Sequence, residues 1–172
     1  MDILIRKEKP DDFRQVARLI EMAFRQKNEA VLVEKLRHKK KYNSNLSIVA
    51  EYNERVIGHI LFFPIVIRTQ ETEIESLALA PLSVSPEFQK MGVGRRLIED
   101  GLRKAREMGY TSVIVLGHPE YYSKFGFVPA RKWGISAPFE VSDDAFMGIE
   151  LQADALLNAS GVVEYPEEFL EV

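Results

Sequence analysis

The sequence contains no cysteine. Disulfide bonds, thiolate zinc sites and a cysteine nucleophile are therefore excluded, and the composition fits a reducing compartment, so we expect a cytoplasmic protein. The longest apolar run, VIGHILFFPIVI at 56–67, has 12 residues, whereas a membrane span needs about 20. The N-terminal MDILIRKEKPDD lacks a basic stretch followed by an apolar one, which argues against a secretory signal. We expect no membrane partner and no metal.

Basic residues are missing from the end of the sequence: none follows Lys132, whereas nine acids lie between 133 and 172. All 23 basic residues and 17 of the 26 acids belong to the first 132 positions. A basic body suits a polyanionic small ligand and an acidic end attracts a cationic one, although ordinary solvated charge is the better explanation for most of these residues. The basic cluster HKKKY (38–42) lacks interleaved aromatics, so no nucleic acid is expected.

The apolar pattern predicts strands alternating with helices. Strands are expected at 2–7, 46–52, 56–67, 74–84, 112–117, around 127–130 and at 146–151, and helices at 11–24, 30–37, 94–108 and 119–125. A tight turn at 53–55 joins two of the strands. This order predicts a mixed α/β sheet with helices on its faces, and the length predicts a single domain over 1–172.

The segment VSPEFQKMGVGRRL (84–97) opens a helix with two glycines, Gly92 and Gly94, and without a capping Ser, Thr, Asp or Asn just before them. The first N–H groups of a helix have no partner within it, and the helix dipole favours an anion there. QKMGVG (89–94) therefore reads as a pyrophosphate cradle. The alternative is a turn whose glycines serve tight strand–helix packing. A Walker A loop is excluded because Arg95 and Arg96 follow the glycine, and a dinucleotide fingerprint because no acid follows at the required distance.

The run from 82 to 130 resembles the GNAT superfamily of acetyl-CoA-dependent N-acetyltransferases. The matching features are the strand end LSV, the Gln-x-x-Gly-x-Gly loop, the helix after it, the strand VIVLG and the element YYSKFGF. The resemblance implies an α/β (α+β) fold with a central mixed, mostly antiparallel sheet flanked by helices and a splay between its two parallel middle strands.

The resemblance also implies roles for individual residues. Acetyl-CoA is the implied co-substrate, and its pantetheine arm would bond the backbone of the strand end, with its pyrophosphate on the amides of the loop. The implied cofactor-binding residues are Leu82, Ser83, Val84, Gln89, Lys90, Met91, Gly92, Val93, Gly94, Arg95 and Tyr122. Tyr122, in Tyr-x-x-x-Gly-Phe, would lie beside the thioester sulfur and hydrogen-bond or protonate it. Tyr121 is one residue too far from Gly-Phe.

The sequence does not single out one residue as the general base. Many relatives carry a Glu in the strand before the loop, and the matching position here is Ala78. Glu75 is the nearest carboxylate, and His118 is a histidine, the residue type most often used as a general base. A water chain, or an amine that arrives neutral, would serve instead of a side chain.

The acceptor implied by the resemblance is a primary amine, on a small molecule or a peptide, that attacks acetyl-CoA directly in a ternary complex. Its site is expected from residues 25–30 and from an aromatic and acidic stretch that suits a cationic amine, with Trp133, Phe139, Glu140, Asp143, Asp144 and Phe146. Pairing through C-terminal strands would allow a homodimer. Two alternatives remain: a GNAT-like module that binds acetyl-CoA or CoA without turnover, which Ala78 favours, and a plain interaction domain.

Overall fold

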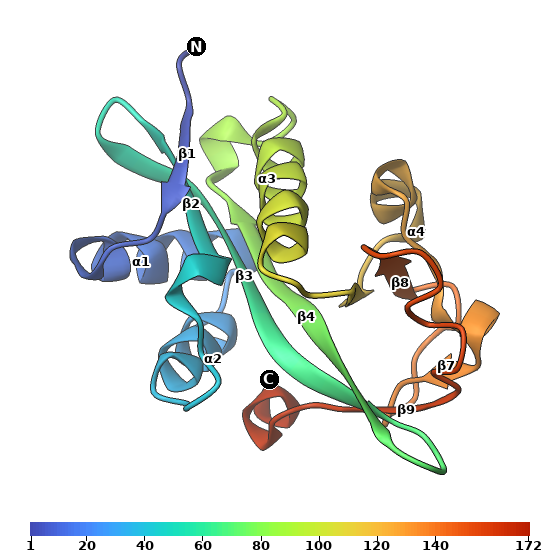
Figure 1. Ribbon diagram of the computed structural model, residues 1–172. Helices are drawn as coiled ribbons and strands as arrows, with labels where there is room; N and C mark the ends of the chain where they lie inside the picture. Colours follow the sequence, from blue (N-terminus) through green and yellow to red (C-terminus); the bar gives the residue numbers. More distant parts are fainter. The chain divides into compact units, whose positions relative to one another are not determined.

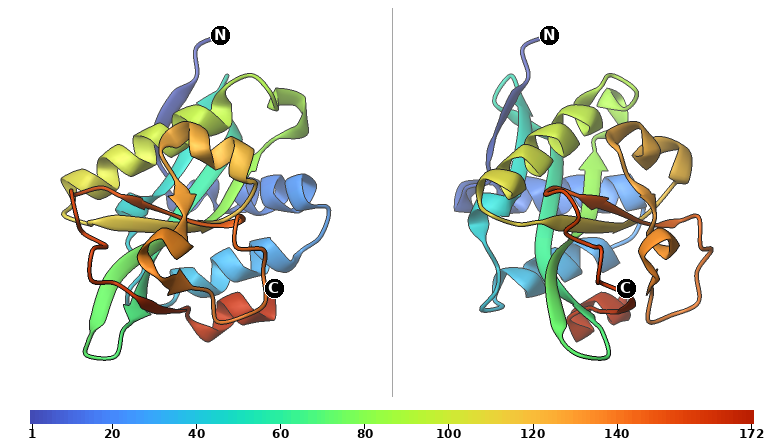
Figure 2. Two further views of the ribbon diagram at one scale, coloured as in Figure 1. Left: turned by 90° about the vertical axis from the view of Figure 1, so that its right-hand side faces the viewer. Right: turned by 45° about the vertical axis from the view of Figure 1, so that its right-hand side comes forward.

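The computed structural model describes residues 1–172, and the contacts divide the chain into two compact units. The first unit comprises Met1–Phe63, Ala80–Lys104 and Glu167–Val172, and the second comprises Pro64–Leu79 and Ala105–Pro166. The strands β3 (Arg55–Arg68) and β4 (Glu73–Val84) and the helix α3 (Val93–Glu107) each contribute to both units (Figure 1, Figure 2). The single domain expected over 1–172 stays a prediction. No helix has both the length and the apolar character needed to cross a membrane.

In the first unit, β1 (Leu4–Lys7), β2 (Ser47–Tyr52) and β3 pair antiparallel in that order. The predicted tight turn joins β2 to β3. Its two central residues, Asn53 and Glu54, have φ values of 49° and 62°, which is the left-handed pair that a type I′ hairpin requires. A bulge between Ala50 and Glu51 shifts the register of β2 on β3.

Helices α1 (Phe13–Phe24) and α2 (Asn28–Arg37) cover one face of these strands, close to their predicted bounds (Figure 1). Their apolar sides and the strand residues beneath them form one buried cluster, which includes Val16, Leu19, Ile20, Leu32, Val33, Leu36, Val49, Leu61 and Phe63. Burial of this apolar surface is the main favourable contribution to folding of the unit. The C-terminal turn Glu167–Glu171 adjoins α2, where Lys35 Nζ lies 2.6 Å from Glu171 Oε2.

The other face of β3 packs against α3, and two glycines permit the close approach. A Cβ at Gly58 would lie 2.9 Å from Leu97 Cδ1 and 3.0 Å from Val93 Cγ1. A Cβ at Gly101 would lie 2.3 Å from the Phe62 ring. The glycines at these positions therefore fix the start and the middle of α3 on the strand.

In the second unit, β5 (Ser112–Leu116) lies between β4 and β8 (Phe146–Glu150). β5 is parallel to β4, and their register runs through Leu77–Val113 and Ala78–Ile114 and ends there, although both strands continue. The resemblance implies such a separation of the middle strands. The expected mixed, mostly antiparallel sheet is confirmed.

Three further strands and a short helix complete the second unit. β6 (Val128–Pro129) pairs with β8, and β9 (Gly161–Glu164) pairs with β3 and with β7 (Ile135–Ser136). The helix α4 (Pro119–Tyr122) begins at the predicted proline, and Gly126 at φ 100° ends the turn that follows it. The sequence analysis did not predict β7 and β9, because strands of two and four residues are too short to show a clear alternation.

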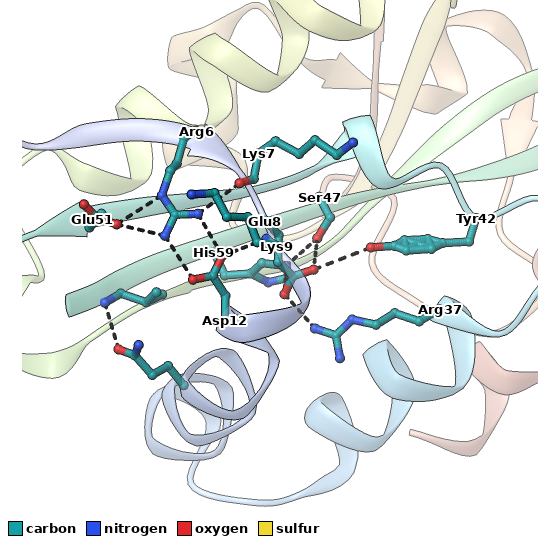
Figure 3. A network of polar contacts seen from close by, with 12 residues as sticks. Arg6, Lys7, Glu8, Lys9, Asp12, Arg37, Tyr42, Ser47, Glu51 and His59 are labelled. Atoms are coloured by element: carbon teal, nitrogen blue, oxygen red, sulfur yellow. Dashed lines mark hydrogen bonds and ion pairs between the residues drawn. The ribbon is translucent and has the colours of Figure 1, made fainter. Parts of the chain in front are cut away.

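A buried polar cluster joins Glu8, Ser47 and His59 in the first unit, and Arg37 reaches it from α2 (Figure 3). Ser47 Oγ donates to Glu8 Oε1 at 2.8 Å and lies 2.9 Å from His59 Nε2. Because the only hydroxyl proton goes to Glu8, we assign the proton of His59 to Nε2. Arg37 Nη2 donates to Glu8 Oε2 at 2.7 Å. Burial, and secondarily the Arg37 charge, lower the pKa of His59 to about 3.

We expect the stability of the protein to fall as the pH drops from 6.5 toward 3, because His59 takes up a proton when unfolded but resists it when folded. One such group changes the free energy of unfolding by up to about 1.4 kcal/mol per pH unit in that window. Urea unfolding from pH 7 to pH 4 measures this dependence. His59→Gln should be less stable at pH 7 and show a flatter profile. His38→Gln, which removes an exposed histidine, is the control; a His59→Gln profile as steep as the wild type contradicts the prediction.

Candidate active site

The turn before α3 lies in the first unit and leaves its amides without acceptors. Lys90 at φ 65° and Gly92 at φ 85° bend the chain, and α3 begins at Val93. The Arg96 N–H donates to the Gly92 carbonyl at 3.2 Å, but no protein group accepts from the amides between 91 and 95. The prediction of an uncapped helix start therefore agrees with the structure. A Cβ at Gly92 would meet nothing within 4 Å.

Two of the three basic side chains around this turn are engaged by other groups of the protein. Lys90 is exposed and has no ion-pair partner. Arg95 Nε donates to Glu99 at 2.8 Å, and this hydrogen bond raises the pKa of Arg95. Arg96 bonds the Ile3 carbonyl at 2.9 Å. Lys90 is thus the basic side chain that is free to contact an anion at this turn, and it adds to the attraction of the backbone dipoles.

The preceding strand end, Leu82 to Val84, belongs to the same unit. Leu82 and Val84 are half-buried, while Ser83 is buried and its hydroxyl has no hydrogen-bond partner. The Gln89 side-chain amide donates to the Val84 carbonyl at 3.2 Å, which folds the loop back onto the strand. Ser85 N–H donates to the Ile57 carbonyl of β3 at 2.8 Å.

Tyr122 belongs to the second unit, at the end of α4. Its ring lies against Gly117, where a Cβ would be 2.4 Å from Tyr122 Cε2, and meets Tyr121 and Phe127 edge to face at 5.2 and 5.7 Å. Tyr122 is 8% exposed, and burial, with a smaller effect of Tyr121, raises the pKa of its phenol. The hydroxyl has no hydrogen-bond partner in the protein. Tyr122 is therefore a fixed, neutral hydrogen-bond donor.

The two predicted bases also belong to the second unit, but the structure does not bring them together with one another. Glu75 is exposed on β4 and unpaired, whereas its neighbour Glu73 binds Arg68 at 2.6 Å. His118 is exposed and precedes α4, and its carbonyl accepts from the Tyr122 N–H at 3.1 Å. Ala78 is 1% exposed, so the position where many relatives carry Glu is here buried and apolar.

The aromatic and acidic stretch after β6 forms a cavity of about 620 Å³ in the second unit. Its lining includes Phe139, Glu140, Asp143 and Phe146, four residues of the predicted acceptor stretch. Two residues of the predicted stretch do not line it. Trp133 lies over Gly148, where a Cβ would be 3.2 Å from its Cζ3, and Asp144 binds Arg131 at 2.8 Å.

The other predicted acceptor segment, 25–30, belongs to the first unit. Only Ala30 of this segment lines the cavity found there, which has a volume of about 630 Å³ and is bordered by residues of α1 and α2. Arg25 ends α1 in the left-handed conformation at φ 57°. Among the described residues there is no group of three or more metal-ligating side chains.

Comparison with known proteins identifies the family. The model of the GNAT acetyltransferase domain matches residues 4–130. The uncharacterized N-acetyltransferase YhbS of Escherichia coli K12 is 34% identical over 168 residues, which cover 97% of this chain and 98% of YhbS. YjhQ of the same organism, another uncharacterized N-acetyltransferase, is 40% identical over 71% of this chain and 68% of its own.

Two solved structures show the same relationship. The crystal structure of Escherichia coli YhbS in complex with CoA has a TM-score of 0.90 and 34% identity, covering 98% of this chain and 92% of that one. A GNAT acetyltransferase from Brucella melitensis in complex with acetyl-CoA has a TM-score of 0.79 and 32% identity, covering 98% of both chains. The chain therefore belongs to the GNAT family of acetyltransferases.

Proposed function

We propose that this acyltransferase acts in the cytoplasm and moves an acetyl group from acetyl-CoA to a primary amine by direct attack in a ternary complex. In that reaction the amine nitrogen bonds the acetyl carbon, the carbon–sulfur bond breaks, the amine loses a proton and the CoA sulfur gains one. The main structural support for this proposal is the turn at 91–95, whose backbone N–H groups have no hydrogen-bond acceptor in the protein. The relatives crystallised with CoA and acetyl-CoA support the choice of co-substrate.

The turn fits a diphosphate. The free N–H groups and the helix dipole favour an anion at the start of α3, and Lys90 adds an unpaired positive charge. The open space around Gly92 lets phosphate oxygens approach the backbone closely. We assign the diphosphate to the amides from Gln89 to Arg95 on this basis.

The strand end fits the pantetheine arm. Backbone groups of successive strand residues point to opposite edges, and Ser85 N–H points to β3. Ser83 therefore also directs its backbone to β3, whereas Leu82 and Val84 direct theirs to the other edge. We assign to Leu82 and Val84 the main-chain bonds that an extended arm would make as an added strand.

Tyr122 would hydrogen-bond the thioester sulfur. The pKa of its phenol lies above the ordinary value near 10, whereas a thiol has a pKa near 8.5. The phenol is thus a weaker acid than the thiol that forms, and a hydrogen bond that stabilises the departing sulfur suits it better than full proton transfer. Glu75 and His118 remain the proposed proton acceptors for the amine, since both are exposed and unpaired.

The buried alanine at position 78 favours a second candidate function, a module that binds acetyl-CoA or CoA without turnover. An assay of CoA release over a panel of primary amines and peptides separates the two. Turnover on any member supports the transferase. Tight CoA binding without turnover on the whole panel supports the module.

CoA should stabilise the fold, by about 2.7 kcal/mol at 100 times its Kd. Gly92→Ala should weaken CoA binding about tenfold or more, because the added methyl group occupies the space we assign to the diphosphate and the residue is strained at φ 85°. Thermal melting with and without CoA, and calorimetric titration of CoA, measure both effects.

The matched control is Gly109→Ala, at the other end of α3. Gly109 has φ 92° and likewise no atom within 4 Å of an added Cβ. Both variants should lose about 1–2 kcal/mol of stability to backbone strain, but only Gly92→Ala should lose affinity for CoA. Equal affinities of the two variants for CoA, or no stabilisation of the wild type by CoA, would contradict the proposed diphosphate site.

Removal of the Tyr122 hydroxyl should slow turnover. For Tyr122→Phe we expect kcat on an accepted amine to fall about a hundredfold, as when one preorganised donor to a transition state is lost, with a change below about threefold in acetyl-CoA affinity because the buried ring is kept. Tyr121→Phe is the control and should retain most of the wild-type kcat. Equal kcat values for the two variants would assign no special role to Tyr122.

A further inference from the structure

The cavity of the second unit carries more negative than positive charge. Two of its lining carboxylates, Glu140 and Asp143, are exposed and have no hydrogen-bond or ion-pair partner. The one basic lining residue, Arg131, is engaged by Asp144 at 2.8 Å. Its charge is therefore largely compensated, and the two free carboxylates set the sign of the potential in the cavity.

Aromatic and apolar side chains form the rest of the wall. Phe139 is 39% exposed, and its ring stacks on Tyr165 with a centroid distance of 6.0 Å and an interplanar angle of 25°. The stack holds the Phe139 ring in place in the wall, where an organic cation is attracted to an aromatic face. Ile135 and Phe146 supply buried apolar surface that suits a short hydrocarbon chain.

One backbone bond joins this wall to the support of Tyr122. Phe146 pairs with Leu116 across β5 and β8. The next pair is a hydrogen bond from Gly117 N–H to the Ala145 carbonyl at 2.9 Å. The Tyr122 ring lies directly on Gly117, so the cavity wall and the support of Tyr122 lie at the same end of the β5–β8 pair, on successive residues that face opposite sides of the sheet.

We infer that the cavity binds the far end of an acceptor that carries a second cationic group, which Glu140 and Asp143 hold against Phe139. This inference rests on the proposed function and narrows the acceptor to the class of short aliphatic diamines and amines with a distant cation. The reacting amine of such an acceptor would extend toward the end of β5 that carries Gly117 and Tyr122, and the bound cation would set its distance and direction.

The test compares cadaverine with n-pentylamine, which has the same carbon chain but only one amine. With acetyl-CoA and the full chain, we expect kcat/KM for cadaverine to exceed that for n-pentylamine at least tenfold. The ratio should fall as salt rises, because the carboxylates are exposed and their attraction is screened.

Charge-neutralising variants locate the effect. Glu140→Gln and Asp143→Asn should each raise KM for cadaverine about threefold or more with little change in kcat, and together they should bring the cadaverine to n-pentylamine ratio close to one. Asp154→Asn removes the same charge from an exposed residue of the second unit that does not line the cavity, and it should keep the wild-type ratio. Phe139→Leu should lower the ratio while both carboxylates remain.

Calorimetric titration of cadaverine into the protein, without acetyl-CoA, gives a readout independent of turnover. Binding of cadaverine that disappears in the double variant but not in Asp154→Asn supports the cation site. If no amine is acetylated while this binding is seen, the proposed transferase function is contradicted and the cation site is not. Turnover of both amines with equal kcat/KM, or a cadaverine affinity that the double variant leaves unchanged, overturns the inference and leaves the transferase intact. Absence of both binding and turnover overturns the inference as well.

Discussion

The contact of α3 with β3 is the constraint on which the first unit's site depends. Val93 and Leu97 can lie against β3 only because position 58 is glycine, and this contact fixes the first turn of the helix. The amides at the start of that turn are thus held in place without a capping side chain. Donors that are already oriented pay little entropy when an anion arrives, which is the advantage of a preorganised site. Under the proposed function the two glycines of the motif, Gly92 and Gly94, would serve the ligand, whereas Gly58 serves the packing.

The second unit reaches a comparable rigidity by a different route. Its key group, Tyr122, is held from below by Gly117 and from the sides by Tyr121 and Phe127. The hydroxyl is the one part of the side chain that the protein leaves without a partner, so the packing fixes a donor that, under the proposed function, would bond the thioester sulfur. In both units, packing holds a hydrogen-bond donor in place while the donor itself has no partner in the protein: the Tyr122 hydroxyl in one and the amides at the start of α3 in the other.

Local patterns in the sequence predicted most of the elements and the donor turn, because both depend on neighbours in the chain. The hairpin at 53–55, the start of α4 at Pro119 and the uncapped start of α3 are examples. The cluster of Glu8, Ser47 and His59 escaped prediction because its members are far apart in sequence and meet only through strand register. For the same reason, composition alone placed Trp133 and Asp144 with the acceptor, whereas the fold turns them to other partners.

Under the proposed function, the buried alanine at 78 changes how the acceptor amine would lose its proton. A carboxylate at that position would stabilise an ammonium ion through its charge and then accept the proton. An apolar position does the opposite: desolvation disfavours the charged amine and lowers its pKa, by up to 3–5 units for a fully buried group. Under the proposed function, the amine would therefore release its proton on leaving water, before attack. The carboxylates of the cavity would complement this, because they bind the cation at the far end of the acceptor and need not touch the amine that reacts.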